Sequence, residues 1–330
     1  MGAVLLVACS PPSPPDTVGP AAAETAAVPL PDYVYDLADA ERFAVLFDRT
    51  DGAPSVAQIQ SDYLDGAGRG VEIFTPYRIV SAEHLAQQVS EQAEMYRRGI
   101  DVCLPAAREA EPMLHAVYAE LTKLFPDRTM PDIHFVFGAG NSGGTAAPDA
   151  QVIGLEVVCA VRESRAEIDQ KLRFFFAHET VHAFQPPTDF DLLFRDPLLH
   201  GVLREGFADY IAWRVTGEVP DADRDLWATE RGKTLWREFE RDRQLILASI
   251  ADGSTTLETW SDEAVAARQN WLGNYKRVPE GWPHEMGYWI GRQIVTDYIS
   301  RADDPDAAFQ AVLGMTDPAA ILQATRYAQP

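Results

Sequence analysis

The stretch Phe174–Pro186, FFFAHETVHAFQP, contains the pentapeptide His-Glu-x-x-His as His178, Glu179 and His182. A helix places residues i and i+4 on one face, so the two imidazoles of such a segment can reach one metal ion. Glu179 then points about 100° to the side by the helical period. From there its carboxylate can act as general base on a metal-activated water without being a ligand. The pentapeptide also arises by chance, so the surrounding sequence has to support this interpretation.

The flanking sequence predicts that this segment is a long and buried helix. Ser164 followed by Glu167 matches a capping box, which starts a helix. Pro186 and Pro187 end it, because proline lacks the amide donor and clashes with the preceding turn. Phenylalanine, alanine and valine surround the two histidines, which indicates burial on most sides.

The rest of the chain predicts an α+β fold that is mostly helical and has a small sheet. From about Asp36 to Phe125 the apolar residues recur at helical spacing. Residues 133–137 and 152–158 are rich in β-branched and aromatic side chains and indicate two strands. The glycine-rich run 138–150 between them favours a flexible connection and lacks the Gly-Lys-Ser/Thr sequence of a phosphate loop. Gly154, inside the second run, indicates a place where another backbone comes close.

Two histidines leave a catalytic zinc site one protein ligand short. The metzincin arrangement would need glycine and histidine at two downstream positions, which hold Gln185 and Thr188. Residues 198–215 predict a helix on which Glu205 and Asp209 lie one turn apart on one face. Either carboxylate suits the third ligand, and the other is placed to hold the outer nitrogen of a ligating histidine. An ordinary solvated face is the alternative interpretation.

A later segment offers candidates for stabilising an oxyanion. We expect a helix from His284 to about Ile299, with His284 and Tyr288 one turn apart. Donors of this kind stabilise the negative charge that forms in acyl transfer. For Tyr288 the competing interpretation is a place in the core. The remaining histidines lack partners at ligand spacing and are expected to be structural or exposed: His84, His115, His134 and His200.

The Glu-x-x-x-Asp pattern that follows His-Glu-x-x-His resembles the gluzincins, the thermolysin-like zinc peptidases. With EGFADY (205–210) and the Gly-Tyr-x-x-Gly segment (287–291), the layout of residues 166–327 resembles a family of predicted zinc-dependent proteases of unknown function. That family is related to gliding-motility lipoproteins of bacteria. The resemblance implies a zincin-like metallopeptidase fold with the small sheet beside the motif helix, Zn²⁺ as cofactor and a peptide or protein as substrate. It also implies that Glu205 is the third ligand and that Asp209 orients a ligating histidine.

The N-terminal sequence predicts export and lipid anchoring. Residues 3–8 form an apolar run that is too short to span a membrane. Leu6-Val7-Ala8-Cys9 resembles the bacterial lipobox, in which the cysteine carries lipid. No lysine or arginine precedes the run, unlike in most signal peptides, and an apolar disordered tail is the alternative. We therefore expect a lipoprotein-type signal segment (1–9), a Pro/Ala-rich tether (10–31) and a zincin-like domain (32–330) with an N-terminal helical part (about 32–128) and a catalytic part (about 129–330).

The lipobox-like start predicts a membrane-anchored protein of the bacterial cell envelope, and the charge limits the kind of partner. A net charge of −22 over 330 residues argues against nucleic acid as a partner, because binding phosphates needs a basic surface. The acidity indicates a well-solvated surface or, alternatively, a preference for cationic substrates. Cys103 and Cys159 could form one disulfide in an exported protein, although their spacing alone does not show that they meet.

The sequence thus predicts a zinc-dependent metallopeptidase with His178, His182 and Glu205 as ligands and Glu179 as general base. One alternative is a non-catalytic envelope-assembly lipoprotein that retains the fold. A second alternative is a metal-dependent hydrolase of non-peptide amides or esters. The presence of Glu179 argues against the first alternative, because a purely structural zinc needs no general base.

Overall fold

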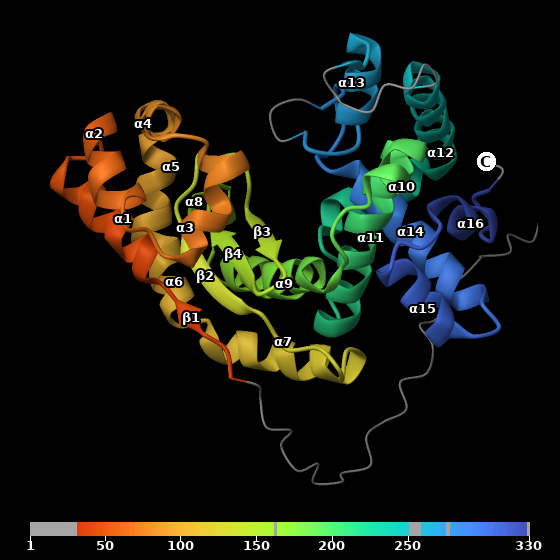
Figure 1. The fold of residues 1–330 in the computed structure, drawn as a ribbon, viewed down its shortest axis with the longest axis horizontal. Coiled ribbons are helices and arrows are strands. Elements are labelled where there is room, and N and C mark those ends of the chain that lie inside the picture. The colour runs from red at the N-terminus through yellow and green to blue at the C-terminus, as the bar shows by residue number, and fades with distance from the viewer. Residues whose placement is uncertain (1–31, 162–163, 251–258, 275–277, 329–330) are drawn as a thin grey trace, which may run out of the picture.

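The computed structural model describes residues 32–161, 164–250, 259–274 and 278–328. It shows a mostly helical chain with one four-stranded mixed sheet, which confirms the expected α+β class. Cys9 and the segments predicted as signal and tether lie outside the described residues. In Figure 1 the sheet and the first helices lie on one side and the C-terminal helices on the other, and the motif helix α9 runs between them.

The elements follow in chain order, with three short π-helical turns among the first helices. They are β1 (Tyr35–Asp36), α1 (Ala38–Arg49), α2 (Val56–Ile59), η1 (Gln60–Leu64), α3 (Arg69–Phe74), η2 (Thr75–Ile79), α4 (Ala82–Glu91), α5 (Ala93–Arg98), η3 (Gly99–Cys103), α6 (Leu104–Arg108), α7 (Glu111–Leu124), β2 (Asp132–Val136), β3 (Gly144–Ala147), β4 (Ala150–Gly154), α8 (Leu155–Val158), α9 (Arg165–Phe184), α10 (Phe190–Arg195), α11 (Pro197–Thr216), α12 (Ala222–Ile250), α13 (Asp262–Gln269), α14 (Met286–Arg301), α15 (Pro305–Leu313) and α16 (Pro318–Gln323).

The sheet has the order β1-β2-β4-β3 and is covered on both faces. β1, β2 and β4 are parallel, whereas β3 runs antiparallel to β4 and lies at one edge. Helix α9 packs against β3 and β4, and α1 and α3 pack against the central strands. β2 is buried from Ile133 to Val136, because a parallel strand in such a layer is covered on both sides, and its buried polar residue, His134, lies 3.1 Å from Asp36. β1 also shows that the first part of the chain, expected to be helical, contributes an edge strand.

Two sequence-based expectations about the strands were wrong in part. The second strand ends at Gly154, and residues 155–158 form a turn of helix instead. A short buried apolar run is compatible with either structure, so its periodicity did not distinguish them. The glycine-rich run is more than a flexible connection, because it contains β3. Its small residues have little intrinsic strand preference, and pairing with β4 supplies the backbone hydrogen bonds that stabilise the strand.

The close backbone approach expected at Gly154 is confirmed. A Cβ atom at Gly154 would lie 2.6 Å from the carbonyl oxygen of Ser142. The Gly154 amide donates to the carbonyl of Gly143 at 3.0 Å. Glycine therefore lets the glycine-rich run fold back onto β4 and form the edge of the sheet.

Helix α9 begins and ends as its sequence predicts. The Ser164 side chain accepts from the Glu167 amide, and the Glu167 side chain accepts from the Ser164 amide, which completes the capping box. The helix stops at Phe184, directly before Gln185 and the two prolines. His178 and Glu179 are buried in its second half, and Glu179 lies against Gly144 of β3.

Helices α11 and α14 cross in direct backbone contact. A Cβ on Gly206 would lie 2.2 Å from the carbonyl carbon of Gly291, and a Cβ on Gly291 would lie 1.7 Å from the carbonyl oxygen of Val202. No side chain fits at either position, so glycine at both allows the two backbones to approach. This crossing holds the first turn of α14 beside α9.

Cys103 and Cys159 form a disulfide, which settles the pairing that the sequence left open. The bond joins η3 to the residue after α8, over a sequence separation of 56. Both cysteines are fully buried.

Candidate metal centre

The Nε2 atoms of His178 and His182 point towards each other. The helical offset of four residues places the rings 4.8 Å apart, and the two Nε2 atoms are separated by 3.1 Å. His178 is buried, and the side chain of His182 is 13% exposed. The pair is therefore shielded on one side and accessible on the other, as a reactive site requires.

Glu205 of α11 completes a group of three potential ligands. Its Oε2 atom lies 3.1 Å from His182 Nε2 and 3.3 Å from His178 Nε2. All three ligand atoms lie within 4.8 Å of one another. Among the residues that the structure describes, this is the one group of three or more His, Cys, Asp or Glu with ligand atoms so close. Burial raises the pKa of Glu205, but the two imidazoles hold it well below its ordinary value.

The surroundings of the two Nδ1 atoms explain why the Nε2 atoms are suited to bind a cation. His182 Nδ1 donates to Gln185 Oε1 at 2.7 Å. The side-chain nitrogen of Gln185, Nε2, donates to the Arg204 carbonyl and thereby fixes the orientation of the Gln185 side chain. His178 Nδ1 lies 3.1 Å from Asp209 Oδ1. Both Nδ1 atoms face acceptors, so when the imidazoles are neutral their Nε2 lone pairs point at each other and at a carboxylate. A metal ion at that point satisfies all three atoms, so the cluster can hold one.

Asp209 is itself held by a buried arginine. Asp209 is fully buried, and its Oδ2 atom accepts from Arg224 Nη2 at 2.7 Å. Burial opposes ionisation, yet Arg224 and His178 lower the pKa of Asp209 below its ordinary value. The second guanidinium nitrogen, Nη1, donates to the Glu285 carbonyl at the start of α14. Arg224, which the sequence interpretation missed, therefore links the partner of His178 to the helix that carries Tyr288.

Glu179 is buried between the two imidazoles and the edge strand. A Cβ on Gly144 would lie 2.5 Å from Glu179 Oε1, so glycine at the start of β3 makes room for this carboxylate. Burial raises the pKa of Glu179, while the charges of His178 and His182 oppose the shift. A carboxylate with a raised pKa, beside a possible metal, is suited to accept and return a proton.

The start of β3 is held by Arg78, another residue that the sequence interpretation missed. Arg78 Nε donates to Ser142 Oγ at 3.3 Å, and Ser142 Oγ donates to the Gly144 carbonyl at 2.7 Å. The carbonyl of Arg78 in turn accepts from the Asn141 side chain at 3.1 Å. These contacts connect η2 to the strand that borders Glu179. No spacing rule could have found them, because residues 78 and 142 are distant in the sequence.

The structure separates the two oxyanion candidates. The Tyr288 ring stacks on His178, with centroids 5.7 Å apart and an interplanar angle of 12°, so Tyr288 lies at the cluster. Helix α14 begins at Met286, and Glu285 before it has a left-handed backbone with φ of 58°. The expectation that His284 opens this helix was therefore wrong. His284 is exposed, and its Nδ1 donates to the Asn274 carbonyl at 3.0 Å.

The other histidines have the structural or exposed roles that the sequence suggested. His134 is buried and lies 3.1 Å from Asp36, and His200 is buried with a pKa lowered by that burial. His115 is exposed on α7, and His84 Nδ1 contacts the Ile79 carbonyl. None of the four belongs to the ligand cluster.

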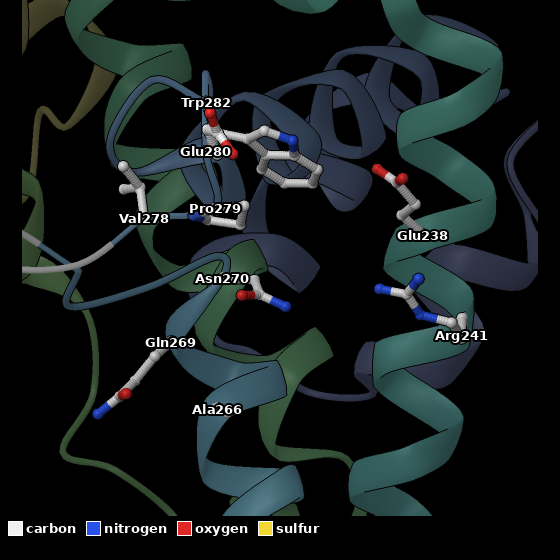
Figure 2. A pocket seen from close by; sticks show the side chains of 9 residues that line it. All are labelled: Glu238, Arg241, Ala266, Gln269, Asn270, Val278, Pro279, Glu280 and Trp282. Carbon is white, nitrogen blue, oxygen red and sulfur yellow. The ribbon is translucent and has the colours of Figure 1, made fainter.

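A cavity of about 380 Å³ lies away from this cluster, between α12 and α13. Figure 2 shows its polar walls, with Glu238 and Arg241 on α12 facing Asn270 and Trp282. None of the predicted site residues lines this cavity, whereas the three potential ligand atoms converge at His178, His182 and Glu205.

Within the described ranges, no helix is both long and apolar enough to cross a lipid bilayer. Comparisons with models of protein families, with curated proteins and with solved structures found nothing that matches this chain.

Proposed function

We propose that this protein is a zinc-dependent metallopeptidase with a zincin-like site. The observation that carries the proposal is the meeting of His178 Nε2, His182 Nε2 and Glu205 Oε2, with the carboxylate of Glu179 buried beside them. Two imidazoles and one carboxylate form the ligand set of a catalytic zinc site, which keeps a coordination position open. A structural zinc site would have four protein ligands and would not need Glu179.

His178, His182 and Glu205 would hold the zinc, which when bound acidifies water and polarises a carbonyl group. Glu179 would accept the proton of the attacking water and pass it to the leaving amine. Tyr288, whose ring stacks on His178, would donate a hydrogen bond to the carbonyl oxygen as negative charge develops on it. Gln185 and Asp209 would keep the imidazoles in the tautomer that presents Nε2.

The edge strand supports a peptide as substrate. Strand β3 pairs with β4 on one side, and its start lies directly against Glu179. An extended peptide can add to such an edge through backbone hydrogen bonds, which would place its scissile bond beside the general base. A non-peptide ester or amide would gain nothing from this edge, so the strand favours peptide hydrolysis.

We further propose that the protein works at the bacterial cell envelope, anchored by lipid at Cys9. The lipobox-like sequence supports this placement, and the Cys103–Cys159 disulfide adds to it. Disulfides persist in oxidising compartments and are rare where thioredoxin and glutathione keep thiols reduced.

Metal analysis combined with one substitution tests the proposed function. The purified protein, reconstituted with zinc, is expected to bind about one zinc per chain and to cleave a mixed peptide library. Glu179→Gln should retain the zinc and lose activity about 10²–10⁴-fold, because it removes the base and leaves the ligands. Asp169→Asn, a change elsewhere on the same helix, serves as the matched control and should keep full activity. A protein without bound zinc, or a Glu179→Gln variant with normal activity, would contradict the proposal.

A further inference from the structure

Arg268, near the end of α13, has an unusual environment for a half-buried arginine. Its side chain has no hydrogen bond or ion pair with any residue in the ranges that the structure describes. Three other largely buried arginines, Arg224, Arg243 and Arg292, each pair with a carboxylate. Arg204 has no ion pair among the described residues, but its guanidinium donates to the Pro186 carbonyl. A partly desolvated guanidinium without a partner is costly, and an anion that enters the site would recover that cost.

Arg268 lies in the last turn of α13, shortly before Trp271 and Leu272, which contact α11 and α14. Burial lowers the pKa of its guanidinium, and the nearby acidic groups of Glu285, Glu205 and Tyr288 oppose that shift. Ala266 and Asn270 line the separate cavity between α12 and α13, as Figure 2 shows. Arg268 is two residues from each, or about 200° around the helix, so it points away from that cavity.

The backbone of Arg268 is fixed relative to the site. Its carbonyl accepts from the amides of Trp271 and Leu272 at 3.0 and 3.1 Å. The Trp271 carbonyl accepts from the Gly287 amide at 2.9 Å, in the first turn of α14. The Leu272 side chain fills the space beside Gly201 and Gly287. These contacts tie the end of α13 to α11, which carries Glu205, and to α14, which carries Tyr288.

No carboxylate of the protein neutralises Arg268 at contact distance. Glu205 is committed to the ligand cluster. Glu285 is buried, and its Oε1 atom accepts weakly from the Asn274 amide at 3.4 Å, but no ion pair joins its carboxylate to Arg268 in the described part of the chain. The site therefore presents a positive group with open hydrogen-bonding capacity in a protein whose net charge is −22.

We propose that Arg268 binds a carboxylate of the substrate and thereby selects anionic peptides. This inference rests on the proposed peptidase function and names its substrate class. A guanidinium matches a carboxylate in a two-point hydrogen-bonded geometry, which positions the peptide as well as attracting it. The carboxylate comes either from the free C-terminus or from an acidic side chain near the scissile bond. This selectivity would be opposite to the preference for cationic substrates, which is the alternative interpretation of the net charge of −22.

Binding without turnover tests this inference. The zinc-loaded, full-length Glu179→Gln variant is immobilised and offered randomised hexapeptides made as C-terminal acids and as C-terminal amides. Retained peptides are counted by mass spectrometry, and hydrolysis by the parent protein is measured separately. Enrichment of acids over amides of about 10-fold or more is expected if the C-terminus is bound, since a charge-assisted hydrogen bond contributes on that order. Enrichment of Asp and Glu within the amide pool is expected if a side chain is bound.

Substitutions assign the effect to Arg268. Added to the Glu179→Gln background, Arg268→Gln should abolish the enrichment, Arg268→Lys should keep part of it, and Arg237→Gln, at an exposed position on α12, should keep all of it. Absence of any enrichment in the parent background, or enrichment that survives Arg268→Gln, overturns the inference. If Arg268→Gln does not fold, the inference is tested by comparing the enrichment of acids over amides in Arg268→Lys with that in the Glu179→Gln parent. Undiminished enrichment in Arg268→Lys would then contradict it. Enrichment without hydrolysis by the parent would refute the peptidase function alone, and hydrolysis without enrichment would refute the role of Arg268 alone.

Discussion

At the scale of single residues, two carboxylates one turn apart have different surroundings. Glu205 Oε2 faces the inner nitrogens of both histidines, whereas Asp209 Oδ1 faces the outer nitrogen of His178 and its Oδ2 pairs with Arg224. Their spacing on α11 does not distinguish them, because both lie on the same face. The two side chains differ in burial, since the Glu205 side chain is 24% exposed and the Asp209 side chain is fully buried.

This difference predicts unequal losses of zinc affinity. Glu205→Ala removes a ligand and should weaken zinc binding more than 100-fold. Asp209→Asn keeps the shape of the side chain and still presents a carbonyl to His178, so a loss of about 10–100-fold is expected. Zinc titration of both variants in one buffered metal series measures the order. Weaker binding by Asp209→Asn than by Glu205→Ala would reverse the two roles and leave the metal site itself in place.

At the scale of elements, the site depends on how closely α11 and α14 approach. Val202, Gly206 and Gly291 form the contact, and the stack of Tyr288 on His178 lies next to it. Gly206 and Gly291 belong to the segments 205–210 and 287–291, on which the family resemblance rests. The structure gives their glycines a physical reason, which is close packing of two helix backbones.

A substitution at this crossing should destabilise the protein even though alanine is the better helix former. Gly206→Ala places a methyl group 2.2 Å from backbone atoms of α14 that cannot rotate away, and we expect a loss of about 1–3 kcal/mol. Gly232→Ala on α12 is the matched control, because a Cβ there meets nothing within 4 Å and should stabilise the helix by about 0.5–1 kcal/mol. Urea unfolding of both variants tests the contrast. Equal free energies of unfolding for the two variants would show that α11 and α14 move apart to accept the methyl group without loss of stability.

At the scale of the whole molecule, one buried core and one disulfide hold distant segments together. The core extends from Ala40 in α1 to Leu322 in α16, across both parts of the predicted domain. The sheet joins β1, at the start of the described chain, to β3, whose Gly144 lies against Glu179 of the motif helix. The Cys103–Cys159 bond then ties the first helices to the segment that leads from β4 towards α9.

Loss of the disulfide should lower the free energy of unfolding by about 4 kcal/mol, from the loop-closure entropy of a bond that spans 56 residues. The double variant Cys103→Ala/Cys159→Ala and the reduced parent are expected to unfold at similar denaturant concentrations, both below the oxidised parent. Guanidinium unfolding with and without reductant measures the shift. An oxidised parent no more stable than the reduced one would refute a stabilising role.

The sequence by itself determined the features of this protein that depend on neighbouring residues. The capping box at Ser164, the prolines after Gln185 and the i,i+4 histidines define α9 and one half of the ligand cluster, because helix geometry is local. The helix that carries Glu205 and Asp209 follows from the same periodicity. Only the tertiary structure decided which carboxylate meets the Nε2 atoms, where β3 borders Glu179, and that Arg224 and Arg268 lie near the site. These contacts join residues far apart in the chain, and they arise from the packing of whole elements, which no local spacing encodes.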